Sequence, residues 1–204
     1  TVDDITVRKT SELRIAVLMR ELQHRLKNTL AVVTSVLNGS KAQHASLDTY
    51  AEAVSGRVYA LAHAQELLRS SDWQDVWMSQ VCDGILKSFV SDTGQIKTDW
   101  QHDILVPEQY VQTSAMAVYE LASNSMKYGA LSVPGGVVEV SGREAGTARQ
   151  FEWKETGGPR TKDGAFETRG FGSLLLCSIW PEEMNGTSTY RGETDGAVYR
   201  MVLE

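Results

Sequence analysis

Apolar residues recur every three or four positions from about residue 11 to residue 37, which is the spacing of one face of an α-helix. The run has no proline and no interior glycine before Gly39-Ser40, where we expect the helix to end. With 3.6 residues per turn, one apolar stripe is formed by Ile15, Leu18, Leu22, Leu26, Leu30, Val33, Val36 and Leu37. His24 projects roughly opposite the centre of this stripe, so its imidazole is predicted to face water.

A second helical stretch is predicted to be capped by Ser46 and to run to about Arg69. Its apolar side is expected to consist of Leu47, Tyr50, Val54, Val58, Leu61 and Leu68. The two helices make a hairpin, and a single two-helix layer leaves half of each apolar face in water. Doubling the hairpin into a dimeric four-helix bundle would bury these faces, so we predict a homodimer. The alternative is that the stripe packs on the chain's own second domain, which gives a monomer.

After residue 72 the pattern changes to short strands alternating with helices. Helices are predicted at residues 78–89 and 112–128, and strands at 96–100, 137–141, 150–154, 187–191 and 197–203. Thr194-Asp195-Gly196 has the composition of a hairpin turn between the last two strands. This order predicts an α+β fold with one sheet covered on one side by helices. We therefore divide the chain into a helical hairpin, residues 1–72, and an α+β domain, residues 73–204.

Composition narrows the classes of function. The 204 residues, 42% of them hydrophobic, can bury one core of ordinary size plus a smaller helical element. The net charge of −6, with no basic stripe between aromatic residues, argues against nucleic acid as a partner. Cys82 and Cys177 lack metal-ligand spacing and are predicted to be buried, reduced thiols, which fits a cytoplasmic location. No apolar run approaches the roughly 18 residues of a membrane span.

Three polar residues share one face of the helix predicted at 112–128. Glu120, Asn124 and Lys127 are spaced i, i+4 and i+7. Taken alone, the triplet also fits a plain solvated face. As a site, Asn124 offers a neutral oxygen to a hydrated Mg²⁺ shared with phosphates, and Lys127 offers them a point charge. Glu120 can hold a metal-bound water or accept a proton.

Two glycine-containing segments follow in the second domain. Residues 153–159, Trp-Lys-Glu-Thr-Gly-Gly-Pro, place the carboxylate of Glu155 where it can accept from an adenine amine, and the glycines let backbone approach a flat base. Residues 170–173, Gly-Phe-Gly-Ser, precede a leucine run and resemble a glycine loop that opens a helix and attracts phosphate. Each signal is weak alone. In this order, with Arg160, Lys162 and Arg169 between them, they predict a nucleotide lid.

Together with residues 21–30, Glu-Leu-Gln-His-Arg-Leu-Lys-Asn-Thr-Leu, these segments resemble the H, N, G1 and G2 boxes of bacterial sensor histidine kinases. From about residue 21 to residue 204 the set is similar to the HWE family, whose catalytic domain has the Bergerat ATP-binding fold. Trp153 and Glu155 match the tryptophan and glutamate for which the family is named. Tyr119, however, stands where the family has its named histidine. The neighbouring HisKA_2-type kinases are therefore the alternative family that the chain resembles.

The resemblance implies a two-component sensor histidine kinase core, an ATP-dependent protein-histidine kinase. His24 would be the phosphoacceptor, and the phosphoryl group would pass to an aspartate of a response-regulator receiver domain. ATP and Mg²⁺ are the implied cofactors, with Asn124 as the metal ligand. Glu120 and Glu21 are rival residues to orient or deprotonate the imidazole. The remaining nucleotide contacts implied are Lys127, Tyr128, Glu155, Gly157, Gly158, Gly170, Phe171, Gly172 and Ser173.

The start of the chain and two rival functions complete the expectations. Residues 3–9 resemble the exit strand of a PAS-type sensor domain, so we expect a fragment of a longer protein with an upstream sensor. One rival is a non-catalytic, dimeric phosphotransfer or scaffold protein with a degenerate ATP domain. The other is a protein of the same fold that binds ATP without histidine chemistry, such as a serine kinase. The retained ATP-site residues argue against the first, and the helix bearing His24 argues against the second.

Overall fold

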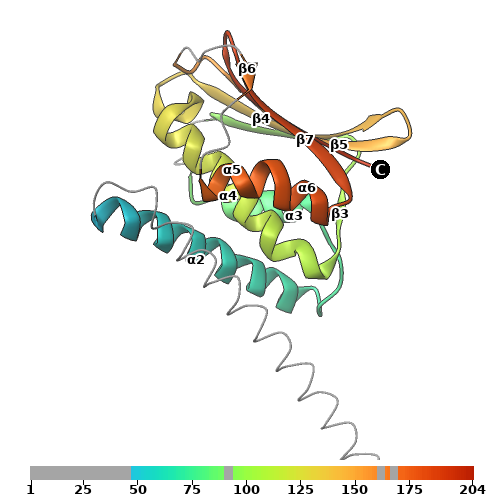
Figure 1. The fold of residues 1–204 in the computed structure, drawn as a ribbon. Helices are drawn as coiled ribbons and strands as arrows, with labels where there is room; N and C mark the ends of the chain where they lie inside the picture. The colour runs from blue at the N-terminus through green and yellow to red at the C-terminus, as the bar shows by residue number, and fades with distance from the viewer. Residues whose placement is uncertain (1–46, 90–93, 160–163, 166–169) are drawn as a thin grey trace, which may run out of the picture.

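The computed structural model of the chain describes residues 47–89, 94–159, 164–165 and 170–204. The first predicted helix, and with it His24, lies outside the described residues. The described part is built in layers, with a six-stranded sheet on one side and helices on the other (Figure 1). The prediction of an α+β fold with one sheet covered by helices is confirmed.

The sheet has the strand order β2-β4-β5-β8-β7-β6. β2 runs parallel to β4, and the other neighbours pair antiparallel. The strands are β2 (Ile96–Trp100), β4 (Val137–Ala145), β5 (Ala148–Thr156), β6 (Gly164–Ala165), β7 (Gly186–Glu193) and β8 (Gly196–Leu203). In β5 Phe151, Trp153 and Glu155 are buried and alternate with less buried residues, because one face of the sheet packs on the helices. All five predicted strands are present, and Thr194 and Asp195 form the predicted turn between β7 and β8.

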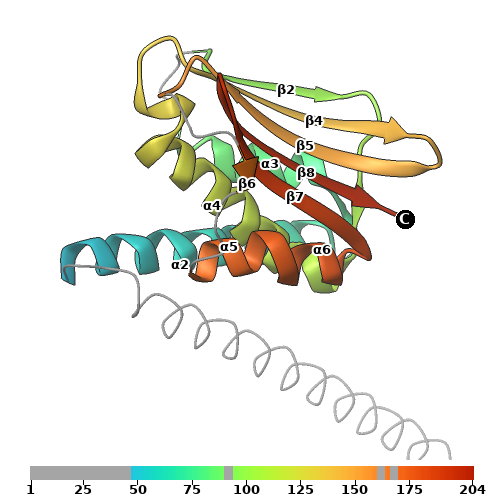
Figure 2. The same cartoon turned by 45° about the horizontal axis from the view of Figure 1, so that its top comes forward.

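Helices α3 (Met78–Leu86) and α4 (Val111–Tyr128) lie against the sheet, as does a C-terminal helical run. That run consists of α5 (Phe171–Leu174), the π-helical segment η3 (Leu175–Ile179) and α6 (Trp180–Glu183) (Figure 2). A two-stranded ribbon of β1 (Val76–Trp77) and β3 (Leu105–Val106), with short 3₁₀ turns η1 (Glu108–Tyr110) and η2 (Ala130–Ser132), completes the fold. These two-residue strands are too short to leave an alternating pattern in the sequence.

Aromatic side chains join the helical run to the sheet. The ring of Trp180 stacks on that of Tyr199 with centroids 5.6 Å apart, and the ring of Phe151 meets Trp180 edge-on at 5.3 Å. The buried indole of Trp180 donates a hydrogen bond to the Ser114 hydroxyl at 2.9 Å, so its polar atom is satisfied. This packing ties the end of the helical run to both the sheet and α4.

Helix α2 (Leu47–Ser70) lies on the side of α3 and α4 that faces away from the sheet (Figures 1 and 2). The predicted extent of α2 is confirmed, but its predicted apolar side is wrong in part. Leu47 is 80% exposed and Val58 is 44% exposed. The buried residues are instead Ala53, Arg57, Ala60, Leu61, Ala64 and Leu68. Small alanine side chains let α2 approach α4 closely, so α2 shares one core with the α+β part.

The packing of α2 bears on two expectations that stay predictions. Helix α2 packs against α3 and α4. This is the arrangement expected for the monomer alternative, in which the apolar stripe packs on the chain's own second domain. The homodimer and the division at residue 72 remain predictions.

The two cysteines differ from expectation in one respect. Cys82 is buried, and burial raises the pKa of its thiol well above the usual range. Cys177, in the η3 segment, is only half-buried, which corrects the expectation that both are buried. Both are free thiols. Among the described helices, none combines the length and apolar character that crossing a membrane would take.

Candidate functional site

Three segments that are far apart in the sequence meet beside the C-terminal half of α4. A Cβ placed on Gly172, at the start of α5, would lie 2.4 Å from the Oε2 atom of Glu120, so the glycine backbone lies directly against this carboxylate. On the other side, a Cβ on Gly158, after β5, would lie 2.9 Å from the Cα of Ala130. The helix face and both glycine segments that the sequence singled out therefore border one region of the molecule.

Glu155 lies on β5 and is only 3% exposed. Its Oε2 atom accepts a hydrogen bond from the Ala130 backbone N–H at 2.8 Å, and Oε1 accepts from the indole N–H of Trp153 at 3.1 Å. Trp153 and Glu155 are two residues apart on one strand, so their side chains point to the same face. A carboxylate offers about four acceptor positions, so Glu155 keeps capacity to accept from a further donor such as an amine. The tryptophan and glutamate thus form one unit in which the indole orients the carboxylate.

Glu120 is also buried, at 6% exposed, and has a charged partner. The Nε atom of Arg57, on α2, donates to Oε1 of Glu120 at 2.5 Å. The same guanidinium lies 4.6 Å from the ring centroid of Phe171, within range of a cation–π contact. Glu120 is therefore not part of a solvated face. Sequence analysis missed Arg57, although a charged residue at helical spacing from Ala53, Ala60 and Ala64 was a signal that could have been found.

Asn124 is half-buried and shares a hydrogen bond with the hydroxyl of Tyr190, on β7. Burial raises the pKa of Tyr190, the charge of Glu155 raises it further, and the hydrogen bond with Asn124 opposes the shift. The phenol is thus neutral at ordinary pH and fixes the position of the Asn124 amide. Tyr190 was not singled out from the sequence, although its inward position in the alternating β7 was visible there.

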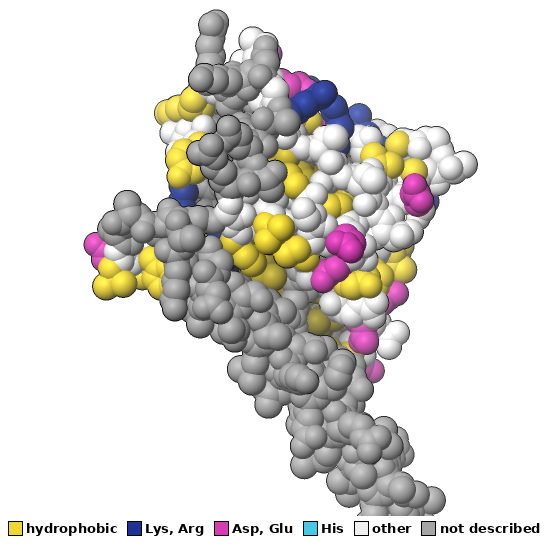
Figure 3. Space-filling view, viewed as in Figure 1, with side chains coloured by type: hydrophobic (Ala, Val, Ile, Leu, Met, Phe, Trp, Pro, Cys, Tyr) yellow, Lys and Arg dark blue, Asp and Glu magenta, His cyan; other side chains and the backbone are white. Residues whose placement is uncertain are grey.

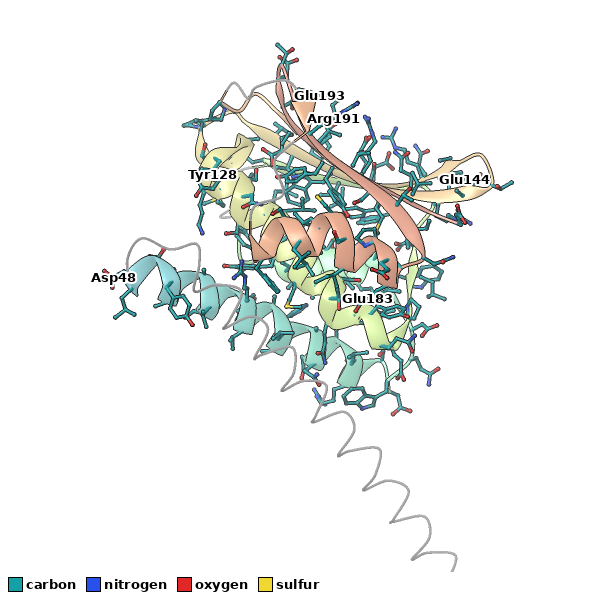
Figure 4. The ribbon with its side chains drawn as sticks, in the orientation of Figure 1. Asp48, Tyr128, Glu144, Glu183, Arg191 and Glu193 are labelled. Carbon is teal, nitrogen blue, oxygen red and sulfur yellow. The ribbon has the colours of Figure 1, made fainter. Side chains whose placement is uncertain are left out.

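Lys127 and Tyr128 lie at the rim of this region. Tyr128 is 72% exposed, and Figure 4 shows it at the outer end of α4. Lys127 is exposed and borders a groove with Phe89, Tyr119 and Ser123, on the side of α4 that faces α2. The structure therefore brings Glu120, Asn124 and Glu155 close to the glycine segments and leaves the other two predicted contacts facing solvent.

Tyr119, which replaces the family's histidine, packs between α2 and α4. Its ring centroid lies 5.4 Å from that of Phe89, and a Cβ on Gly56 of α2 would overlap its hydroxyl oxygen. Burial raises the pKa of the Tyr119 hydroxyl, and the charge of Glu120 adds to the shift. Tyr119 therefore fills the helix interface instead of joining Asn124 and Glu155.

The glycine loop has the backbone geometry its sequence predicts. Gly170 has a φ of 98°, in the region that favours glycine. The hydroxyl of Ser173 donates to the Gly170 carbonyl at 3.1 Å and closes the turn into α5. Gly157, after β5, also has a positive φ, of 70°, and its backbone lies beside Gly135. Both loops thus bend sharply where they border the site.

The side chains present fit one Mg²⁺ bound mainly by phosphates. Within the described ranges, no group of three or more His, Cys, Asp or Glu residues is arranged to hold a metal ion. Mg²⁺ in nucleotide sites commonly takes one or two protein oxygens and completes its shell with water and phosphate. The half-buried amide of Asn124, held by Tyr190, provides one such neutral oxygen.

Charged side chains are distributed unevenly on the face drawn in Figure 3. Lys and Arg side chains gather near the end of the sheet that carries β6. Figure 4 places Arg191 and Glu193 at this end, and their side chains form an ion pair at 3.0 Å. This pair lies at the end of β7, beyond Tyr190.

Comparisons with known proteins identify relatives of this chain and proteins of similar fold. Residues 21–101 match the model of the HWE histidine kinase family. A blue-light-activated histidine kinase of Brucella anthropi is 34% identical over 200 residues, which are 96% of this chain and 40% of that protein. The blue-light-activated histidine kinase EL346 of Erythrobacter litoralis has a similar fold, with a TM-score of 0.60, 18% identity, and coverage of 91% of this chain and 58% of that one.

The histidine kinase domain of EL346, compared separately, gives a TM-score of 0.56 at 16% identity, covering 74% of this chain and 73% of that domain. The described residues therefore have the fold of a histidine kinase domain. The chain covers 40% of the length of the Brucella anthropi relative. Residues 21–101 thus match the HWE histidine kinase family, and over 96% of its length the chain is similar to a blue-light-activated histidine kinase.

Proposed function

We propose that the chain is the catalytic core of a sensor histidine kinase, which transfers the γ-phosphoryl group of ATP to a ring nitrogen of His24. The observation that carries the proposal is the convergence of Glu120, Asn124 and Glu155 with the glycine loop, in a fold similar to histidine kinase domains. A nucleotide needs one set of groups for its base, one for its phosphates and one for its cation.

Each group has one task in the proposed site. Glu155, oriented by Trp153, would accept the exocyclic amine of adenine, and the turns at Gly157 and Gly158 would let the base approach. Asn124 would hold Mg²⁺, and Gly170 to Ser173 would border the phosphates. ATP with Mg²⁺ would supply the phosphoryl group and neutralise part of its charge. Lys127 and Tyr128 would contact nucleotide only from the rim.

His24 would act as the nucleophile in its neutral form. An imidazole with an ordinary pKa near 6.5 is mostly neutral at cytoplasmic pH, so positioning is the main requirement. Glu120 and Glu21 remain rivals for orienting the ring. We further propose a homodimer through the hairpin of residues 1–72, a receiver domain as phosphoryl acceptor, and a PAS-like sensor upstream in the full protein.

The test is incubation of the chain with γ-labelled ATP and Mg²⁺, followed by acid treatment of the product. Label on wild type that is lost in acid, and absent from His24→Ala and Asn124→Ala, would support both halves of the site. His102→Ala is the matched control, since His102 lies far along the sheet beside Glu144, and it should label normally. Nucleotide binding without label would favour the scaffold alternative, and acid-stable label would favour a serine kinase.

A further inference from the structure

Arg57 is the only charged residue among the described side chains that α2 buries. Its side chain is 5% exposed, and its neighbours on the buried face are alanine and leucine. Taking a guanidinium out of water is costly unless it is paired, and replacing such pairs by apolar residues is often neutral or stabilising. Helix packing alone therefore gives no reason for an arginine at this position.

Arg57 makes contacts with two parts of the candidate site. Its Nε atom donates to Glu120, in the middle of α4, and its guanidinium covers Phe171, which is the second residue of the glycine loop. These residues are 51 positions apart in the sequence, and α2 brings one cation to both. Arg57 thus joins the helix face that carries Asn124 to the loop that borders the phosphates.

The charge of Glu120 makes this contact matter for a nucleotide. One carboxylate oxygen faces Arg57, and the other lies against Gly172. A polyphosphate bound at this loop would lie near that carboxylate, and like charges repel strongly in a partly desolvated site. A cation shared between the carboxylate and the loop removes the repulsion without occupying the space of the phosphates.

We infer that Arg57 is a positioning residue of the nucleotide site, which cancels the charge of Glu120 and orders Phe171. The inference rests on the proposed function and adds a coupling to it. Nucleotide in the loop and docking of α2 favour each other, since both need the same guanidinium in place, and such coupling is reciprocal. The helix that follows the phosphoacceptor segment is in this way part of the nucleotide site.

The first experiment titrates Mg²⁺ and the non-hydrolysable ATP analogue AMP-PNP into wild type and three variants. Arg57→Met should weaken binding by about tenfold or more, the size expected for loss of a charge-assisted hydrogen bond. Arg57→Lys should lie between the two, because an ammonium keeps the charge but lacks the planar group that covers Phe171. Arg69→Met is the matched control, since Arg69 lies on the same helix in an exposed pair with Glu66, and it should bind as wild type does. Equal affinity of Arg57→Met and wild type would overturn the inference.

A double variant separates charge cancellation from general damage to the fold. Arg57→Met with Glu120→Gln removes the uncompensated charge, so binding should return to within about threefold of wild type if repulsion is the cause. Binding that stays as weak as in Arg57→Met would overturn the electrostatic argument. Thermal unfolding midpoints without nucleotide, measured for all variants, identify any that fail to fold.

Phosphorylation of the same proteins distinguishes this inference from the proposed function. Wild type that binds AMP-PNP but takes no label would remove the kinase proposal, and the affinities would still decide the role of Arg57. Wild type that binds no AMP-PNP would remove both. If Arg57 positions the loop, Arg57→Lys should reach the same labelling as wild type at saturating ATP. Its KM for ATP should be raised.

Discussion

Glu120 and Glu155 are both buried carboxylates at the candidate site, but they are held in different ways. Glu155 accepts hydrogen bonds from two neutral donors, the indole of Trp153 and the backbone N–H of Ala130. Glu120 pairs with a cation, Arg57, which comes from a different layer of the molecule. The first carboxylate is held by neutral donors, and the second by a charged one.

The difference follows from what each carboxylate faces. Binding of an adenine base, as proposed, requires a hydrogen-bond acceptor for its amine. A carboxylate held by neutral donors remains a good acceptor. A carboxylate beside a loop that is proposed to bind phosphate requires a counter-charge. Glu155 is complete within the α+β part, whereas Glu120 depends on α2. Changes at Glu155 should therefore act within one domain, and changes at Glu120 should alter how α2 docks.

The largest effect is expected for Glu120→Ala. Removing the carboxylate of a buried ion pair takes away the counter-charge of the Arg57 guanidinium, at a cost of about 3–5 kcal/mol in unfolding free energy. Denaturant unfolding measures this directly. Arg57→Met combined with Glu120→Met should recover most of the loss, because no charge is then left buried. A loss below about 1 kcal/mol in Glu120→Ala would show that water reaches the pair.

A smaller loss, about 2–3 kcal/mol, is expected for Glu155→Ala, which leaves two buried N–H groups without an acceptor. Glu155→Gln keeps one acceptor oxygen and should lose less. Comparison of the two unfolding curves tests whether the hydrogen bonds, rather than side-chain volume, are responsible. Equal losses would contradict the proposed role of the neutral donors.

Trp153→Phe should cost about 1–2 kcal/mol, since it removes one donor to Glu155 and leaves a small void in the core. Its effect on AMP-PNP affinity should exceed that of Tyr199→Phe, a control on the neighbouring strand that also removes one buried polar group. Tyr199 donates to the Leu176 carbonyl, away from Glu155. Matching affinities in the two variants would argue against an orienting role for Trp153.

The smallest effect concerns pH and the docking of α2. Burial against α3 lowers the pKa of His63 below 6.5, with Lys87 adding to the shift and Glu66 opposing it. Because the folded chain binds a proton less readily than the unfolded one, this contribution is complete above about pH 6.5 and is lost as the pH falls below it. Unfolding followed from pH 7.5 to 5.5 should show a small decline that His63→Gln removes. A decline of the same size in the variant would assign it to carboxylates.

The periodic elements could be predicted from the sequence because burial on one face leaves a repeating pattern. The strand at residues 96–100 is found with the predicted bounds, and α4 begins one residue earlier than expected. The face of α2 could not be predicted, because three alanines count little in a hydrophobic stripe although they allow the closest helix contact. Burial of Leu61 and Leu68 was foreseen, and exposure of Leu47 and Val58 was not.

Candidate site residues could be predicted from the sequence where they belong to a short local motif. Glu155 and the glycine loop are such segments, and each lies beside the site in the structure. Arg57 and Tyr190 act through partners on other elements, and pairing across 63 positions, as between Arg57 and Glu120, leaves no local signal of which residue the partner is. The position of Tyr190 beside Asn124 likewise depends on the order of strands in the sheet.

Tyr119 and Gly56 together fill one volume between two helices, so the two positions are not free to vary separately. A larger residue at 56 has no room while the tyrosine hydroxyl occupies that space. A histidine at 119, the family's residue, would vacate it and make alanine at 56 acceptable. Conversion of this chain toward the usual family motif is therefore a two-site exchange, and the single substitution would leave a hole in the joint between α2 and α4.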